Sequence, residues 1–147
     1  MRRPLLALAL GLGLAGVAAA ESATLTVHKD PNCGCCGAWV EHMTAAGFRV
    51  EVRNTHDLVS VKQAHGVPRG LASCHTAVIE GHVIEGHVPA EDVRRFLAEA
   101  RSGEGLAVPG MPVGSPGMEV PGHGTDDYQV VRFRAGESGG EVYSRHP

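Results

Sequence analysis

The stretch TLTVHKDPNCGCCGAWVEHMTAAGFRVEVRN, residues 24–54, decides the fold class of this chain. Its first part, residues 24–28, alternates apolar and polar side chains as a half-buried strand does. Apolar side chains at three- and four-residue spacing follow, among them Trp39 and Met43, and predict a helix with these two residues in the core. Residues 48–54 alternate again and predict a second strand. A strand, a helix and a strand in this order are typical of an α/β domain.

Three cysteines crowd the connection between the first strand and the helix. Cys33, Cys35 and Cys36 lie within four positions, and we expect Cys33 in the loop and the other two in the first helical turn. The N-terminus of a helix favours a thiolate, because partial positive charge and free N–H groups lie near the sulfur. A fourth cysteine, Cys74, comes at the start of the predicted third strand. In the sheet that the later elements predict, that end of the strand faces the same loop, so we expect all four sulfurs to converge.

The next elements extend the α/β pattern. Residues 57–66 predict a short helix. Two β-branched runs within residues 74–89, separated by a turn at residues 80–82, predict a tight hairpin. A further helix opens at Pro89 and places Phe96 on its apolar face. Strand, helix, strand, helix, hairpin and helix is the order of a thioredoxin-like α/β domain, which is the fold that we predict.

Two C-terminal segments complete the expected single domain. Residues 103–124 contain seven Gly and four Pro, a composition that leaves no room for a regular element. Loops of this length in small domains are usually functional covers or linkers, so we expect this Gly/Pro-rich loop to cover the sulfurs. Residues 128–145 alternate on both sides of a Gly-rich turn and predict a terminal β-hairpin that returns to the domain.

The first 20 residues differ from everything that follows. Arg2 and Arg3 precede an apolar run that ends in three alanines, which is typical of a secretory signal peptide. The run is too short and too rich in small residues for a membrane span. We therefore expect cleavage of residues 1–20, one exported, periplasmic domain over residues 21–147, and no membrane attachment after cleavage.

The charge balance excludes one class of partner. The chain carries 13 basic and 16 acidic residues, for a formal net charge of −3. Residues 1–20 contain two of the basic residues and no acidic one, so the mature domain has 11 basic against 16 acidic residues and a net charge of about −5. Because no strongly basic patch is left, nucleic acid and anionic membrane surfaces are not expected as partners.

The crowding of the cysteines favours copper among the soft metals. Thiolates select Cu(I), zinc or iron–sulfur clusters. Zinc in a four-cysteine site prefers two well-separated CxxC pairs, and the familiar iron–sulfur spacings differ from this one. Cu(I) accepts two or three sulfurs and lets one thiolate bridge several ions, so three clustered thiols completed by Cys74 suit a multinuclear cluster. Zinc stays the alternative metal, and two structural disulfides or a metal-free redox pair stay open as alternatives to metal binding.

Three stretches of the sequence also resemble a known family. They are CGCCGAWVEHMTAAGF (residues 33–48), HGVPRGLASCHTAVIEGHVIEGHVPAEDVRRFL (residues 65–97) and GLAVPGMPVGSPGMEV (residues 105–120). Together they are similar to the CopG-type exported copper-resistance proteins, long catalogued as a domain of unknown function. The resemblance covers nearly all of the mature chain and implies a thioredoxin-like fold, a periplasmic location and a multinuclear copper–thiolate site. The site positions that it implies here are Cys33, Cys35, Cys36 and Cys74.

Other side chains are candidates for additional ligands. The participation of several is left open, namely His28, His75, His82, His87, Met111 and Met118. Neutral imidazole suits oxidised copper. Successive strand residues point to opposite faces, so His82 and His87, five residues apart, do not share a face of a straight strand. We therefore expect this pair to belong to a solvent-exposed turn. Pro68 is expected to fix the turn before Cys74, with its peptide isomer left open.

Two classes of function follow from these features. The favoured one is a periplasmic copper-binding protein with a Cu(I)–thiolate cluster that acts in copper resistance or homeostasis, with redox activity at the copper left open. Its expected partners are copper ions and a copper exporter or periplasmic metallochaperone. The alternative is a thiol–disulfide oxidoreductase in which Cys33 is the nucleophile and Cys36 the resolving thiol. The two differ in their need for Cys35 and Cys74.

Overall fold

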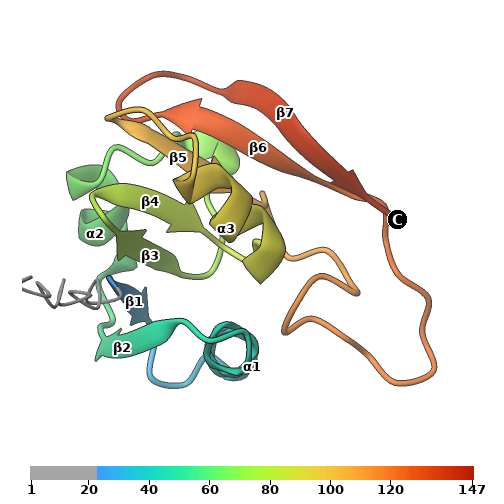
Figure 1. Ribbon diagram of the computed structural model, residues 1–147. Helices are drawn as coiled ribbons and strands as arrows, with labels where there is room; N and C mark the ends of the chain where they lie inside the picture. The colour runs from blue at the N-terminus through green and yellow to red at the C-terminus, as the bar shows by residue number, and fades with distance from the viewer. Residues whose placement is uncertain (1–22) are drawn as a thin grey trace, which may run out of the picture.

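The computed structural model describes residues 23–147, so the expected signal peptide, residues 1–20, lies outside the described residues. Within the described range the chain forms one mixed sheet of seven strands, in the order β2-β1-β3-β4-β5-β6-β7, and three α-helices (Figure 1). The chain is therefore an α/β domain, as predicted. None of the helices in this range is both long and apolar enough to cross a bilayer.

The elements follow one another in the expected order as far as the third α-helix. The strands are β1 (Thr24–Lys29), β2 (Arg49–Asn54), β3 (Thr76–Ile79), β4 (His82–Glu85), β5 (Glu104–Ala107), β6 (Tyr128–Arg134) and β7 (Gly140–His146). The helices are α1 (Gly34–Ala45), α2 (Leu58–Ala64), the short 3₁₀-helix η1 (Arg69–Leu71) and α3 (Ala90–Leu97). Strands β2 and β7 form the two edges of the sheet (Figure 1).

The first three elements form a parallel strand–helix–strand unit. β1 and β2 pair in parallel, with Leu25 opposite Val50. Cys33 is the N-cap of α1, and its side chain accepts a hydrogen bond from the backbone N–H of Cys36. Gly47 follows the end of α1 at φ 92°, a left-handed conformation that glycine adopts without strain. The predicted strand, helix and strand are confirmed.

Strands β3 and β4 form a hairpin with a two-residue turn. Glu80 and Gly81 both have positive φ, 52° and 79°, as in a type I′ turn. The turn sets a register in which Thr76 faces Glu85. His82 is the first residue of β4, which corrects the three-residue turn that the sequence predicts.

The core lies between the sheet and the helices. Trp39 and Met43 of α1, and Val93 and Phe96 of α3, are fully buried. They belong to one apolar cluster that also contains side chains of β1, β3, β4, β5 and β6. Trp39 Nε1 donates a 2.9 Å hydrogen bond to the carbonyl oxygen of Val88, which ties α1 to the segment between β4 and α3. Burying each of these large side chains contributes about 1.5–3 kcal/mol.

Strand β5 corrects the expectation that residues 103–124 contain no regular element. It pairs in parallel with β4 and antiparallel with β6, and all four of its residues are buried. A Cβ atom on Gly105 would lie 2.6 Å from the carbonyl oxygen of Val83 and 2.7 Å from the ring of Phe133. The glycine that suggests a loop in the sequence therefore marks a close approach between strands.

The C-terminal part of the chain widens the sheet. β6 and β7 pair antiparallel, with Tyr128 opposite His146. Asp92 of α3 accepts a 2.9 Å hydrogen bond from Ser144 Oγ and lies 2.7 Å from His146 Nε2, so α3 holds the end of β7. Between β5 and β6, the described residues 108–127 contain no helix or strand and run as a long loop (Figure 1).

Replacing Gly105 by Ala should destabilise the domain, because the new Cβ would overlap backbone and ring atoms of neighbouring strands. Overpacking of this kind lowers the free energy of unfolding by about 1–3 kcal/mol. Urea unfolding of the reduced protein measures the change. In the control Gly124→Ala the new Cβ meets nothing within 4 Å, so the free energy of unfolding should stay within about 0.5 kcal/mol of wild type. Equal effects of the two substitutions would contradict the tight packing of β5.

Candidate metal centre

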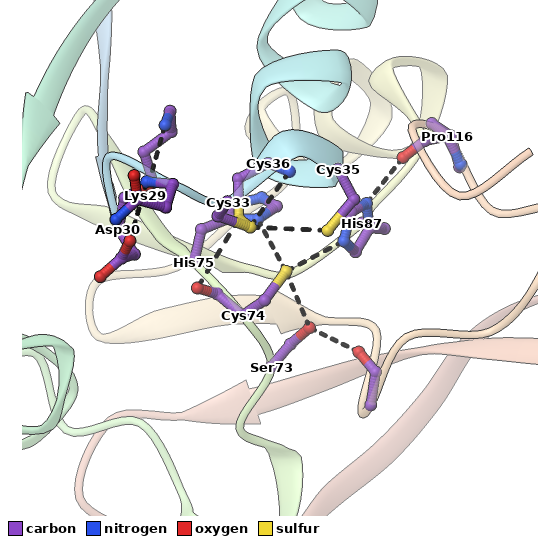
Figure 2. Close-up of a disulfide and its surroundings, with 12 residues drawn as sticks. Lys29, Asp30, Cys33, Cys35, Cys36, Ser73, Cys74, His75, His87 and Pro116 are labelled. Carbon is purple, nitrogen blue, oxygen red and sulfur yellow. Dashed lines mark hydrogen bonds between the residues drawn. A yellow bond between two sulfur atoms is a disulfide. The ribbon is translucent and has the colours of Figure 1, made fainter.

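Four cysteine sulfurs converge at one end of the sheet, as the sequence predicts. The Sγ atoms of Cys33, Cys35, Cys36 and Cys74 all lie within 4.8 Å of one another (Figure 2). Cys33 and Cys36 are joined by a disulfide, whereas Cys35 and Cys74 carry free thiols. The Sγ atoms of Cys33 and Cys35 are 3.5 Å apart. We call these four residues the sulfur group.

Three of these sulfurs lie in a tight turn and the first turn of α1, residues 30–36, which we call the cysteine turn. The carboxylate of Asp30 accepts a 2.8 Å hydrogen bond from the backbone N–H of Asn32, which is an Asx turn. The backbone N–H of Cys33 then donates to the carbonyl oxygen of Asp30 at 3.1 Å. Cys33 Sγ accepts the N–H of Cys36 at 3.3 Å and so satisfies a free donor of the first helical turn.

Cys74 reaches the same place from another part of the chain. It lies just before β3, which pairs antiparallel with β1 so that Thr76 faces His28. This pairing brings the start of β3 to the end of β1, where the cysteine turn begins. Cys36 Sγ lies 3.8 Å from the carbonyl oxygen of Cys74.

Two histidines form a second donor group around Cys74. Cys74 Sγ lies 3.0 Å from His87 Nε2 and 3.4 Å from His75 Nδ1 (Figure 2). Both imidazoles are fully buried, and their ring centroids are 5.0 Å apart. We call Cys74, His75 and His87 the mixed group. Cys74 is the member that the two groups share.

The hydrogen bonds around His87 fix its tautomer. His87 Nδ1 lies 2.8 Å from the carbonyl oxygen of Pro116, which can only accept, so Nδ1 carries the proton. The neutral ring then presents the lone pair of Nε2 to Cys74, whose thiol donates. Burial lowers the pKa of His87, and burial together with the neighbouring Cys35 raises the pKa of Cys74 to about 12. A metal bound here takes the place of the thiol proton.

The mixed group has an unused donor atom. His75 Nε2 is buried and has no hydrogen-bond partner among the described residues. Burial, and then the nearby His87, lower the pKa of His75 well below its usual value, so the ring is neutral. One nitrogen of a neutral imidazole carries a proton and donates, and the other has a free lone pair and accepts. Neither donor group contains a carboxylate. Thiolate and imidazole ligands of this kind fit copper or zinc and do not fit hard cations such as calcium.

The register of the β3–β4 hairpin explains why His87 belongs to the site. Because Thr76 faces Glu85, His75 falls opposite Gly86 and Cys74 falls opposite His87. The backbone N–H of Gly86 indeed donates to the carbonyl oxygen of His75 at 3.0 Å. The expectation that His87 lies in an exposed turn is therefore wrong. Counting outward from the two-residue turn in the sequence would have found the pair.

Three other candidate side chains, those of His28, His82 and Met111, have different surroundings. His28 faces His65, with ring centroids 6.0 Å apart. His82 Nδ1 lies 2.9 Å from the carbonyl oxygen of Glu104 and so does not join His87. Met111 is 53% exposed. The Pro68 peptide is trans, as are all the others in the described residues, and Pro68 is the N-cap of η1.

Residues 108–127 pack against the first turn of α1 through one glycine. A Cβ atom on Gly117 would lie 2.7 Å from the backbone nitrogen of Trp39 and 2.8 Å from the carbonyl oxygen of Cys35. The neighbouring Pro116 supplies the carbonyl oxygen that holds His87. The segment therefore touches both donor groups, one through α1 and the other through His87.

Replacing Gly117 by Ala should push this segment off α1 and release the Pro116 carbonyl from His87. The His87 ring would then populate both neutral tautomers, which ¹⁵N chemical shifts of the imidazole nitrogens distinguish. The control Gly122→Ala introduces the same positive-φ strain in the same segment, but its Cβ meets nothing within 4 Å. It should keep His87 protonated at Nδ1. A Gly117→Ala protein with the tautomer of the control would contradict the role assigned to this contact.

Comparisons with known proteins identify the family of this chain. A family model described as "Protein of unknown function, DUF411" matches residues 71–118, which include Cys74, His75 and His87. Two solved structures, described as copper resistance protein CopG in form 1 and form 2, are each 44% identical to this chain with a TM-score of 0.78. Each match covers 86% of this chain and 99% or 100% of the other. No curated protein matches the chain. Because relatives this similar are matched over their full length, this chain belongs to the CopG family of copper resistance proteins.

Proposed function

We propose that this protein binds Cu(I) as a multinuclear thiolate cluster through Cys33, Cys35, Cys36 and Cys74 and serves copper resistance. The observation that carries this proposal is the convergence of four sulfurs within 4.8 Å from two separate parts of the chain. A redox pair needs two sulfurs, whereas bridging of several Cu(I) ions uses all four. The relatives described as copper resistance proteins support copper as the metal.

Zinc fits the sulfur group less well than copper. A mononuclear zinc site needs four sulfurs in a tetrahedron, and three of the four here come from one turn and the first turn of a helix. The Cys33 and Cys35 sulfurs are already 3.5 Å apart, which suits ligands that share ions. Up to about four Cu(I) ions would balance the charge of four thiolates without a charged residue nearby.

Loading with Cu(I) requires the reduced protein. In the disulfide-bonded form only Cys35 and Cys74 carry thiols. Opening the Cys33–Cys36 disulfide takes two electrons and two protons and yields two further thiols. Each thiol gives up its proton when it becomes a metal ligand. The number of sulfur ligands that the protein offers therefore depends on its redox state.

The mixed group extends the proposal to redox activity at the copper. Cys74, His75 and His87 offer one thiolate and two imidazoles, a ligand set that accommodates Cu(II). Because Cys74 belongs to both groups, it can serve sulfur-only coordination and sulfur–nitrogen coordination without leaving its place. This arrangement supports one-electron oxidation and reduction of copper beside the cluster.

The remaining expectations belong to the same proposal. The strand order β2-β1-β3-β4, with β1 and β2 parallel and the others antiparallel, supports a thioredoxin-like core. The leader-like residues 1–20 support export, and hence work in the periplasm. There the protein would take copper from, or deliver it to, an exporter or a metallochaperone.

A second candidate function is thiol–disulfide exchange by Cys33 and Cys36. The disulfide that joins these two residues at the N-terminus of α1 favours it. In this function Cys33 would form a mixed disulfide with the substrate, and Cys36 would resolve that mixed disulfide. Cys35 and Cys74 would be dispensable.

The variants Cys35→Ser and Cys74→Ser separate the two functions. Anaerobic titration of the reduced mature protein with Cu(I), with elemental analysis, gives the number of copper ions per chain. We expect several ions in the wild-type protein and about half or fewer in each variant, since a bridging thiolate holds more than one ion.

Both variants should keep the Cys33–Cys36 pair, and the reduction potential of that disulfide serves as the control for an intact fold. If both variants bound as much copper as wild type, the cluster would be excluded. Thiol–disulfide exchange by Cys33 and Cys36 would then be the better account of the site.

A further inference from the structure

A buried ion pair between Lys62 and Glu85 contacts Ser73, the residue before Cys74, and belongs to neither donor group. Glu85, at the end of β4, is fully buried, and the side chain of Lys62, from α2, is 16% exposed. Lys62 Nζ donates to Glu85 Oε1 at 2.6 Å. Replacing a buried ion pair by apolar side chains of similar size is often neutral or stabilising, so stability alone does not require a pair at this position.

The carboxylate of Glu85 holds the backbone on both sides of the metal-binding candidates. Its Oε1 accepts the backbone N–H of Ser73 at 2.7 Å, and its Oε2 accepts the hydroxyl of Thr76 at 2.7 Å. Lys62 Nζ also donates to Thr76 Oγ1 at 3.0 Å. Ser73 and Thr76 immediately precede and follow Cys74 and His75 in the chain. One carboxylate therefore fixes both ends of the two-residue segment that carries the shared sulfur.

The same carboxylate also links β3 to β4, because Glu85 of β4 accepts a hydrogen bond from Thr76 of β3. Glu85 faces Thr76 in the β3–β4 ladder, and His87 lies two residues further along, opposite Cys74. The contact between Cys74 Sγ and His87 Nε2 at 3.0 Å thus lies just beyond the point where the two strands are tied together. Ser73 Oγ adds a link to the carbonyl oxygen of Gly110, in the segment between β5 and β6, at 2.5 Å.

The geometry points to Glu85 as a positioning residue that holds Cys74 where the sulfur group and the mixed group can share it. This role deepens the proposed function and rests on it. Lys62 has the supporting role of balancing the charge of Glu85, because an uncompensated buried carboxylate is strongly destabilising. Without the hydrogen bonds to Glu85, the segment around Cys74 is free to move. Cys74 Sγ then no longer lies close both to the other cysteine sulfurs and to the imidazoles of His75 and His87.

Two double variants separate the effect of the hydrogen-bond acceptor at position 85 from the effect of its charge. Glu85→Gln with Lys62→Met removes both charges but keeps an amide oxygen for the N–H of Ser73. Glu85→Leu with Lys62→Met removes both charges and also the acceptor. The first pair is the matched control for the second, and near-ultraviolet circular dichroism of each reduced protein checks that the fold is kept.

The first readout needs no copper. The reduced, metal-free proteins are alkylated with iodoacetamide, and mass spectrometry follows Cys74 and Cys35 in the same molecules. We expect Cys74 to react about tenfold faster in the Glu85→Leu/Lys62→Met protein than in its control, because a segment that loses a buried hydrogen bond opens more often. Cys35, which Glu85 does not anchor, should change by less than about twofold. An equal acceleration of both cysteines would indicate a general loss of stability and would overturn the specific role of Glu85.

The second readout is the copper itself. The Glu85→Leu/Lys62→Met protein should bind fewer Cu(I) ions than its control in anaerobic titration of the reduced protein. Equal alkylation rates of Cys74 in the two double variants would overturn the role of Glu85 and leave the proposed function standing. A wild-type protein that binds no copper through its cysteines would overturn the proposed function, whereas the alkylation rates would still decide whether Glu85 anchors Cys74.

Discussion

The register between β3 and β4 is the constraint on which the site depends. The two-residue turn at Glu80 and Gly81 places Thr76 opposite Glu85, and the same count places Cys74 opposite His87. A shift by one residue would turn every side chain of one strand to the other face of the sheet. It would separate the shared sulfur from its imidazole and from the turn that carries the other three cysteines.

Two further parts of the chain converge on this hairpin. α1 brings Cys35 and Cys36 in its first turn and is held in place by the buried Trp39, which reaches the backbone just after His87. The segment between β5 and β6 packs Gly117 against the same turn and keeps the proton of the His87 ring on the nitrogen that faces away from the sulfur. The sulfur group thus joins the start of α1 to the start of the hairpin, the mixed group lies on the hairpin alone, and the two groups meet at Cys74 Sγ.

The parts of this arrangement that depend on local sequence can be predicted, whereas the parts that depend on long-range contacts cannot be recognised from local patterns. Apolar spacing predicts α1, and the chain order predicts that Cys74 approaches the cysteine turn. β5 is missed because four residues around Gly105 give no alternation to recognise, and the reason for the glycine is a neighbouring strand. His87 is misjudged because its burial depends on the hairpin register, although that register could have been counted from the turn.

The central claim is that four thiolates hold several copper ions together. X-ray absorption at the copper edge of the anaerobically loaded, reduced protein tests it most directly, because it reports both the ligand atoms and the neighbouring metals. The account predicts a first shell of sulfur alone and short copper–copper vectors. A single copper ion with no metal neighbour, or a first shell dominated by nitrogen or oxygen, would contradict it.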